Sequence, residues 1–442
     1  MSETTLTSQA ADLENSVDPD PRLSAPIALQ PGAPGSGALP PSPWKGTRLV
    51  ASPAALKAPA ATDYSFMITN RYNINNDNTP YNPFQPATSP VNQVYPLANG
   101  NLWWALSQDQ ANDPNASDFQ MQSPTPSTTP PNSFQQAIVT NLQAQSQQYG
   151  SSQLTLFIHG LGNLWVDAVA GTSALGANLA NSSYTGLVVG FDWPSYDEYW
   201  SGLYYSSDSY AFPPAGTQGT IRDNINGSSQ AFGNVLSFMQ GLRSTNGISN
   251  LTLNIVCHSE GNYMDMVGML SVSGVQIDHV LMLAADINNG AFQIPATGLV
   301  GQGSQISQTD PSAVVTVYFS NNDDVLASSQ AAYQGNNPIY DDKNVHNPAY
   351  GGRMGQTGPA YNIGQQQPNV YSLDCSGVLT PQYIAQLEAN GVIPNGATLH
   401  SSYLYVPQLG ADIAQALDGV APGSITGRSQ GANPNAYYLN PT

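Results

Sequence analysis

The strongest chemical signal in the sequence is a serine that stands between an apolar run and a helical pattern. Residues 251–256 read LTLNIV, and the chain continues as CHSEG up to Gly261. A buried strand that leads into a serine two positions before a glycine, and then into a helix, is the context of a nucleophile elbow. The turn is tight, so the second residue after the serine must be small, and Gly261 meets this condition. The pattern therefore predicts that Ser259 is a nucleophile.

A second signal is a glycine-containing turn after an earlier apolar run. Residues 154–158 (LTLFI) are followed by His159, Gly160 and Leu161. Acyl transfer through a serine requires N–H groups that point at the negative oxygen of the transition state. A turn that follows a strand can supply one donor, and the residue after the nucleophile supplies the other. The backbone amides of Leu161 and Glu260 are therefore the predicted oxyanion donors.

Short apolar runs alternate with helical patterns along the chain, which indicates a mostly parallel central sheet with helices on both faces. A helical pattern at residues 230–242 is one example, since its apolar side chains share one face. Ligands of such sheets bind beyond the carboxyl ends of the strands, and both motifs lie there. The expected strands are residues 65–69, 102–106, 154–158, 186–191, 251–256, 279–284, 313–319 and 369–373.

The sequence has five histidines, which limits the choice of a general base. His159 belongs to the oxyanion turn, His258 precedes the nucleophile, and His279 opens an expected strand at the opposite end of the sheet. His346 and His400 remain. The histidine of a triad with this elbow follows the last strand, after the acid. His400 has this position and is favoured, whereas His346 precedes the last expected strand.

The turn and the elbow, in this order, resemble the α/β-hydrolase superfamily, which implies an α/β-hydrolase fold. More narrowly, the chain is similar to a bacterial branch of esterase/lipase-like hydrolases that carry HGYN and HSMGN motifs and mostly lack assigned substrates. The similarity spans about residues 64–415. The further segments that are similar to motifs of this branch are 191–195 (FDWPS), 284–287 (AADI), 318–326 (YFSNNDDVL), 353–358 (RMGQTG), 400–403 (HSSY) and 410–413 (GADI).

Three positions depart from the pattern of this branch. Leu161 replaces its tyrosine, Glu260 replaces its methionine or leucine, and Cys257 replaces the usual glycine two positions before the serine. Leu161 and Glu260 would donate through their backbone, so the hydrolase interpretation does not depend on their side chains. Cys257 is small enough for the elbow.

Three aspartates are candidates for the acid that orients His400. Asp323 and Asp324 follow one expected strand, and Asp286 follows the preceding strand. The resemblance selects Asp323, which matches the aspartate of the branch's Y-x-S-x-x-D motif. Asp286 also fits a helix cap or a carboxylate that fixes a turn.

Residues 191–228 are rich in aromatic side chains and are expected to form a cap insertion over the site. The candidates for substrate binding are Trp193, Tyr196, Tyr199 and Trp200. Two interpretations of these aromatic side chains stay open: they form a cap that binds an apolar acyl group, or they pack together as a small satellite core beneath the insertion.

The expected domain organisation has three parts. Residues 1–62 hold ten of the 35 prolines and form a Pro/Ala-rich arm that we expect to be disordered. Residues 63–427 form the catalytic domain, and residues 428–442 form a C-terminal tail.

Composition excludes several function classes. The chain has 442 residues, of which 29 are acidic and 10 are Lys or Arg, and its net charge of −19 disfavours nucleic acid as a partner. Two cysteines cannot form a disulfide framework or a cysteine zinc site, no residue spacing indicates a metal, and no glycine-rich phosphate loop is present, so no cofactor is expected. No apolar run is long enough to span a membrane, so integral membrane association is not expected. The N-terminus lacks the features of a signal peptide, and the localisation stays open between the cytoplasm and non-classical export.

These motifs predict a serine hydrolase that cleaves carboxylic esters through an acyl-enzyme, with a triad of Ser259, His400 and Asp323. The substrate would be a small-molecule, lipid or polymeric ester. Two alternatives stay open: an acyltransferase that uses the same acyl-enzyme, and a catalytically silent fold that serves as a binding module.

Overall fold

The computed structural model describes ten segments, namely residues 64–71, 96–107, 118–163, 165–195, 221–269, 271–287, 289–292, 313–334, 352–359 and 368–441. The expected N-terminal arm, residues 1–62, lies outside them, as do residues 196–220 of the expected cap insertion.

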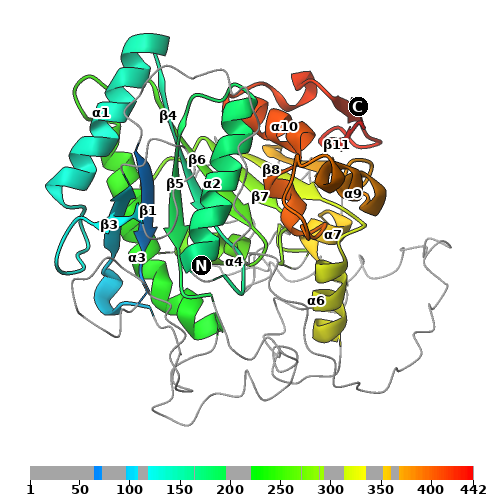
Figure 1. Ribbon diagram of the computed structural model, residues 1–442, viewed down its shortest axis with the longest axis horizontal. Helices are drawn as coiled ribbons and strands as arrows, with labels where there is room; N and C mark the ends of the chain where they lie inside the picture. The colour runs from blue at the N-terminus through cyan, green and yellow to red at the C-terminus, as the bar shows by residue number, and fades with distance from the viewer. Residues whose placement is uncertain are drawn as a thin grey trace, which may run out of the picture. The chain divides into compact units, whose positions relative to one another are not determined.

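The described residues form one sheet of eleven strands in the order β10-β11-β9-β8-β7-β6-β4-β5-β1-β2-β3 (Figure 1). Neighbouring strands from β11 to β1 pair in parallel, and the described antiparallel pairs involve β10 at one edge and β2 and β3 at the other. The strands are β1 (Ser65–Thr69), β2 (Trp103–Ser107), β3 (Gln120–Met121), β4 (Ser152–Ile158), β5 (Leu187–Asp192), β6 (Leu251–His258), β7 (His279–Leu283), β8 (Val314–Phe319), β9 (Val370–Asp374), β10 (Arg428–Gln430) and β11 (Ala436–Leu439). The mostly parallel sheet of an α/β-hydrolase fold is thereby confirmed.

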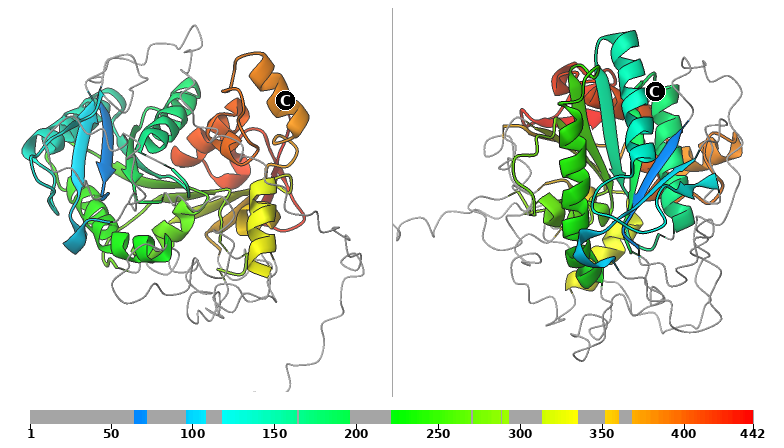
Figure 2. Two further views of the ribbon diagram at one scale, coloured as in Figure 1. Left: turned by 60° about the horizontal axis from the view of Figure 1, so that its bottom comes forward. Right: turned by 90° about the vertical axis from the view of Figure 1, so that its left-hand side faces the viewer.

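Helices lie on both faces of the sheet (Figure 2), because the central strands are apolar on both sides. In β4, Leu156 and Ile158 enter one core, whereas Phe157 enters the other. The first core also contains side chains of α1 (Asn132–Tyr149), α3 (Ile221–Leu242) and α4 (Gly261–Met269). The second contains side chains of α2 (Trp165–Asn181), α9 (Pro381–Ala389) and α10 (Pro407–Leu417).

The order of the strands reverses at β4. The chain passes from β4 to β5 on one side of it and later returns to β6 on the other side. Such a reversal is a topological switch point, the place where ligands of open α/β sheets bind. The turn after β4 and the elbow after β6 meet at this point, since Gly160 lies against Ser259.

The C-terminal residues correct one expectation. Residues 428–442 were expected to form a tail, but β10 and β11 extend the sheet, and β11 pairs in parallel with β9. Tyr437 and Leu439 are buried there, and Arg428 forms a buried ion pair with Asp412 at 2.6 Å. The two strands have three and four residues, which is too short for a recognisable period-2 pattern.

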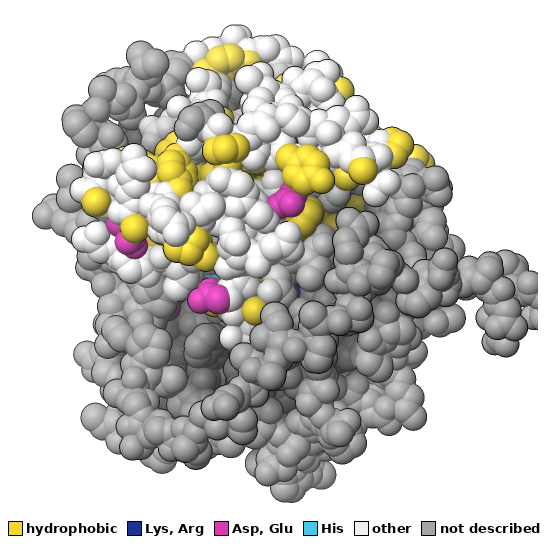
Figure 3. All heavy atoms as spheres, turned by 90° about the vertical axis from the view of Figure 1, so that its right-hand side faces the viewer, with side chains coloured by type: hydrophobic (Ala, Val, Ile, Leu, Met, Phe, Trp, Pro, Cys, Tyr) yellow, Lys and Arg dark blue, Asp and Glu magenta, His cyan; other side chains and the backbone are white. Residues whose placement is uncertain are grey.

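The described surface reflects the low charge content of the sequence. On the face shown in Figure 3, isolated acidic and hydrophobic side chains lie among uncharged atoms. Among the described helices, none combines the length and apolarity needed to cross a bilayer.

Candidate active site

Ser259 stands on a strained turn between β6 and α4. Its φ is +56°, in the left-handed region that non-glycine residues rarely adopt. Gly261, the first residue of α4, passes so close to β4 that a Cβ at this position would lie 2.5 Å from the carbonyl oxygens of Ile158 and His159. Strain of this kind is retained where the surrounding structure imposes it, often at functional sites. The local sequence thus folds as the elbow that it predicts.

The glycine turn after β4 contacts the serine directly. A Cβ on Gly160 would lie 2.6 Å from Ser259 Cβ and 3.2 Å from Ser259 Oγ. The absence of a side chain at Gly160 therefore allows the backbone of the turn to pack directly against the Ser259 side chain. Within the described residues, neither the Leu161 nor the Glu260 amide donates to a backbone carbonyl.

His400 and Asp323 form a buried pair. His400 Nδ1 lies 2.8 Å from Asp323 Oδ2. Asp323 stands between β8 and α6 (Asp324–Gln334), where its Oδ1 accepts the backbone N–H of Leu326 at 3.0 Å and so caps the helix. Burial favours the neutral imidazole, but the Asp323 carboxylate outweighs it, so the pKa of His400 is raised above its usual value.

His258 connects this pair to the elbow. Its Nε2–H donates to the backbone carbonyl of His400 at 2.8 Å, and the two rings lie 4.8 Å apart between centroids. Burial and the neighbouring His400 lower the pKa of His258 to about 3, so the ring is neutral at physiological pH. The residue directly before Ser259 therefore holds the backbone of the predicted base.

The carboxylates of the other two candidate acids have different surroundings, although the backbone N–H of Asp286 donates to the Ser259 carbonyl at 3.2 Å. Asp324 is exposed on the first turn of α6. Asp286 is buried after β7, where it pairs with Arg353 Nε at 2.8 Å and accepts the Ser329 hydroxyl at 2.8 Å. Burial and the neighbouring Asp286 raise the pKa of Glu260 well above its usual value, against the opposing effect of Arg353. Both effects favour the neutral form of the Glu260 carboxyl.

Trp193 differs from the expected substrate contact. Its side chain is fully buried, its Nε1–H donates to the carbonyl of His159 at 2.8 Å, and its ring stacks on the His159 ring at 5.8 Å. Trp193 therefore packs against the glycine turn and holds the backbone of His159 by a hydrogen bond. The remaining predicted residues Tyr196, Tyr199, Trp200 and His346 lie outside the described residues.

Two charged residues to which the sequence motifs assign no role, Arg71 and Asp192, lie beneath the glycine turn as a buried ion pair. Arg71 is the second residue after β1, and Asp192 is the last residue of β5. Their opposite charges are visible in the sequence. That they form a pair follows only from the parallel pairing of β1 with β5, which the sequence does not specify.

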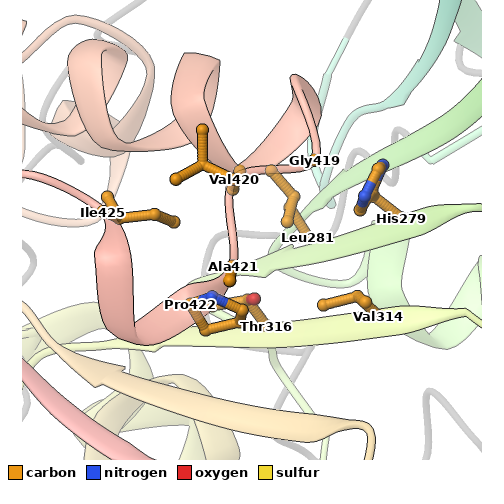
Figure 4. Close-up of a pocket in the computed structure, with 10 residues that line it drawn as sticks. His279, Leu281, Val314, Thr316, Gly419, Val420, Ala421, Pro422 and Ile425 are labelled. Atoms are coloured by element: carbon orange, nitrogen blue, oxygen red, sulfur yellow. The ribbon is translucent and has the colours of Figure 1, made fainter.

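A small cavity of about 60 Å³ lies at the opposite end of the sheet from Ser259 (Figure 4). His279 and Val314, the first residues of β7 and β8, line it together with the chain that follows α10. His279 and Thr316 supply the polar side chains of its lining, and the other side chains that line it are apolar. Among the described residues, no cluster of three His, Cys, Asp or Glu side chains is arranged to bind a metal.

A match to a known protein family agrees with the α/β-hydrolase fold. Residues 131–342 match the model of a family described as alpha/beta hydrolase of unknown function (DUF900). No curated protein matches the chain. The matched segment runs from the start of α1 to beyond α6 and includes Ser259 and Asp323, whereas His400 follows it. The match covers just under half of the chain, and together with the mostly parallel sheet it shows that the chain has the fold of the α/β-hydrolase superfamily, which its motifs resemble.

Proposed function

We propose that this chain is a serine hydrolase that cleaves carboxylic esters through an acyl-enzyme on Ser259. The observation that carries the proposal is the buried His400–Asp323 pair, 2.8 Å apart, which His258 joins to the strained serine turn. A nucleophile, a base and an acid that follow the chain order of this superfamily support acyl transfer.

In the proposed mechanism, Ser259 Oγ attacks the ester carbonyl carbon while His400 Nε2 takes the hydroxyl proton. The amides of Leu161 and Glu260 donate to the oxyanion that forms. The bond to the alcohol breaks as His400 returns the proton to the leaving oxygen. Water then repeats the sequence on the acyl-enzyme, while Asp323 keeps His400 Nδ1 protonated and oriented throughout.

The test is hydrolysis of p-nitrophenyl esters of increasing acyl length by the wild-type protein and by Ser259→Ala. The matched control is Ser152→Ala, which removes a fully buried serine at the amino end of β4. We expect Ser259→Ala to lose activity by several powers of ten and Ser152→Ala to keep it. Full activity in Ser259→Ala would refute the proposal. An excess of added alcohol that diverts the acyl group to a new ester, with little free acid, would favour the acyltransferase instead.

A further inference from the structure

We propose that Arg71 and Asp192 are positioning residues that aim the Leu161 amide at the oxyanion by fixing the turn at residues 159–163. The inference rests on the proposed function, because it assigns a role within the same acyl-transfer site. It concerns residues that contact neither the reacting atoms nor the predicted triad.

The ion pair is buried and closely held. Arg71 Nε lies 2.7 Å from both carboxylate oxygens of Asp192, and both side chains have zero exposure. The Thr69 hydroxyl donates to Asp192 Oδ2 at 2.7 Å. Burial opposes ionisation of Asp192, but Arg71 and His159 outweigh it and hold the pKa of the carboxyl below its usual value. Asp192 is therefore ionised in the folded protein at neutral pH.

Both members of the pair continue into the turn. Arg71 Nη2 donates to the Asn163 carbonyl at 2.7 Å. Asp192 Oδ1 lies 3.0 Å from Nε2 of His159, and Nδ1 of the same ring lies 2.8 Å from the Gly160 carbonyl oxygen. The ion pair thus holds the first and the last residue of the turn from one fixed point.

The Gly160 carbonyl is the atom that these contacts control. It accepts the Asn163 Nδ2–H at 2.8 Å and lies 2.8 Å from His159 Nδ1. In a planar trans peptide, the C=O of one residue points opposite to the N–H of the next. The contacts that fix the Gly160 oxygen therefore also fix the direction of the Leu161 N–H. This N–H lies on the turn that contacts Ser259.

A purely stabilising role accounts poorly for a buried ion pair at this place. The cost of desolvating two charges often equals or exceeds their attraction, so apolar replacements are frequently neutral or stabilising. Apolar side chains, however, cannot donate hydrogen bonds that hold carbonyl oxygens in position. The chain also offers a matched control, the Arg428–Asp412 pair, which is equally buried at 2.6 Å but lies at the opposite edge of the sheet.

The experiment compares Arg71→Met and Asp192→Asn with Arg428→Met and Asp412→Asn. For each variant, kcat and KM are measured with one p-nitrophenyl ester, together with the Kd of an alkylboronic acid, whose tetrahedral adduct places an oxygen in the oxyanion site. We expect the first two variants to lower kcat about 10- to 100-fold, because loss of a whole oxyanion donor costs about 10²- to 10³-fold. KM should stay within about two-fold, boronate affinity should fall in parallel with kcat, and the two control variants should keep wild-type values.

Arg71→Lys keeps the charge but lacks the planar fork that reaches both Asp192 and Asn163. We expect it to fold and to show an intermediate loss of kcat, which keeps the test decisive if Arg71→Met is unstable. Wild-type kcat in folded Arg71→Lys and Asp192→Asn, or equal losses in the control pair, would overturn the positioning role alone. Absence of ester hydrolysis by the wild-type protein would overturn the proposed function and this role with it.

Discussion

Replacing Asp323 with asparagine removes a charge and one hydrogen-bond acceptor without changing the size of the side chain. In the native protein both carboxylate oxygens are used, Oδ2 by His400 Nδ1 at 2.8 Å and Oδ1 by the Leu326 N–H at 3.0 Å. An amide has only one oxygen. If that oxygen keeps the helix cap, the NH₂ group faces His400 and forces the proton of the ring onto Nε2. The ring then cannot accept the proton of Ser259.

We therefore expect Asp323→Asn to lower kcat about 10³- to 10⁴-fold, equivalent to about 4–5 kcal/mol of transition-state stabilisation. The pH dependence should change as well. Because Asp323 raises the pKa of His400 against the effect of burial, its loss lowers that pKa. Activity requires neutral His400, so the acid limb of the pH–rate profile should move to lower pH.

The assay is kcat/KM for one ester across pH 4 to 9, with Asp324→Asn as the control, since that neighbouring carboxylate is exposed. The control should retain activity within about two-fold. A loss of less than ten-fold in Asp323→Asn, or an acid limb that moves to higher pH, would refute the assignment. A larger loss in Asp286→Asn would identify Asp286 as the acid.

Three further predictions follow from the same geometry. His258→Phe removes the donor to the His400 carbonyl, and we expect kcat to fall about ten-fold with little change in KM; an unchanged kcat would show that other contacts hold the base. Glu260→Gln should keep kcat within about three-fold at pH 7, because burial and Asp286 raise the pKa of Glu260 and so favour the neutral carboxyl that glutamine resembles. Once Glu260 ionises as the pH rises, its carboxylate would place a negative charge beside the predicted oxyanion site, so wild-type activity should decline where that of Glu260→Gln does not; identical pH–rate profiles would contradict this. Gly261→Ala places a Cβ 2.5 Å from two carbonyl oxygens, and urea unfolding should show a loss of about 1–3 kcal/mol or more, whereas an unchanged midpoint would mean that the elbow relaxes freely.

Sequence patterns predicted the parts of the site that are encoded locally. The elbow at Ser259 and the turn at Gly160 each depend on one strand and the few residues after it, so their residue types are enough to place them. The strands from β4 to β9 were predicted to within a few residues, because buried parallel strands read as continuous apolar runs.

The parts that sequence did not predict depend on which strands are neighbours. Arg71 and Asp192 meet only because β1 pairs with β5, 121 residues apart in the chain. Trp193 was expected to contact substrate, since an aromatic residue in a cap and one beneath a turn have the same local sequence. The contact of His258 with the His400 backbone spans 142 residues and has no local signature at all.

The most direct test of the central claim is to locate a covalent adduct on the protein. The folded wild-type chain is treated with a fluorophosphonate, digested, and mapped by peptide mass spectrometry, with Ser259→Ala and Ser152→Ala treated in parallel. An activated serine at the elbow predicts one adduct, on Ser259, present in the wild-type and Ser152→Ala proteins and absent from Ser259→Ala. A folded wild-type protein that forms no adduct, or an adduct that persists in Ser259→Ala, would contradict the assignment of Ser259 as the nucleophile.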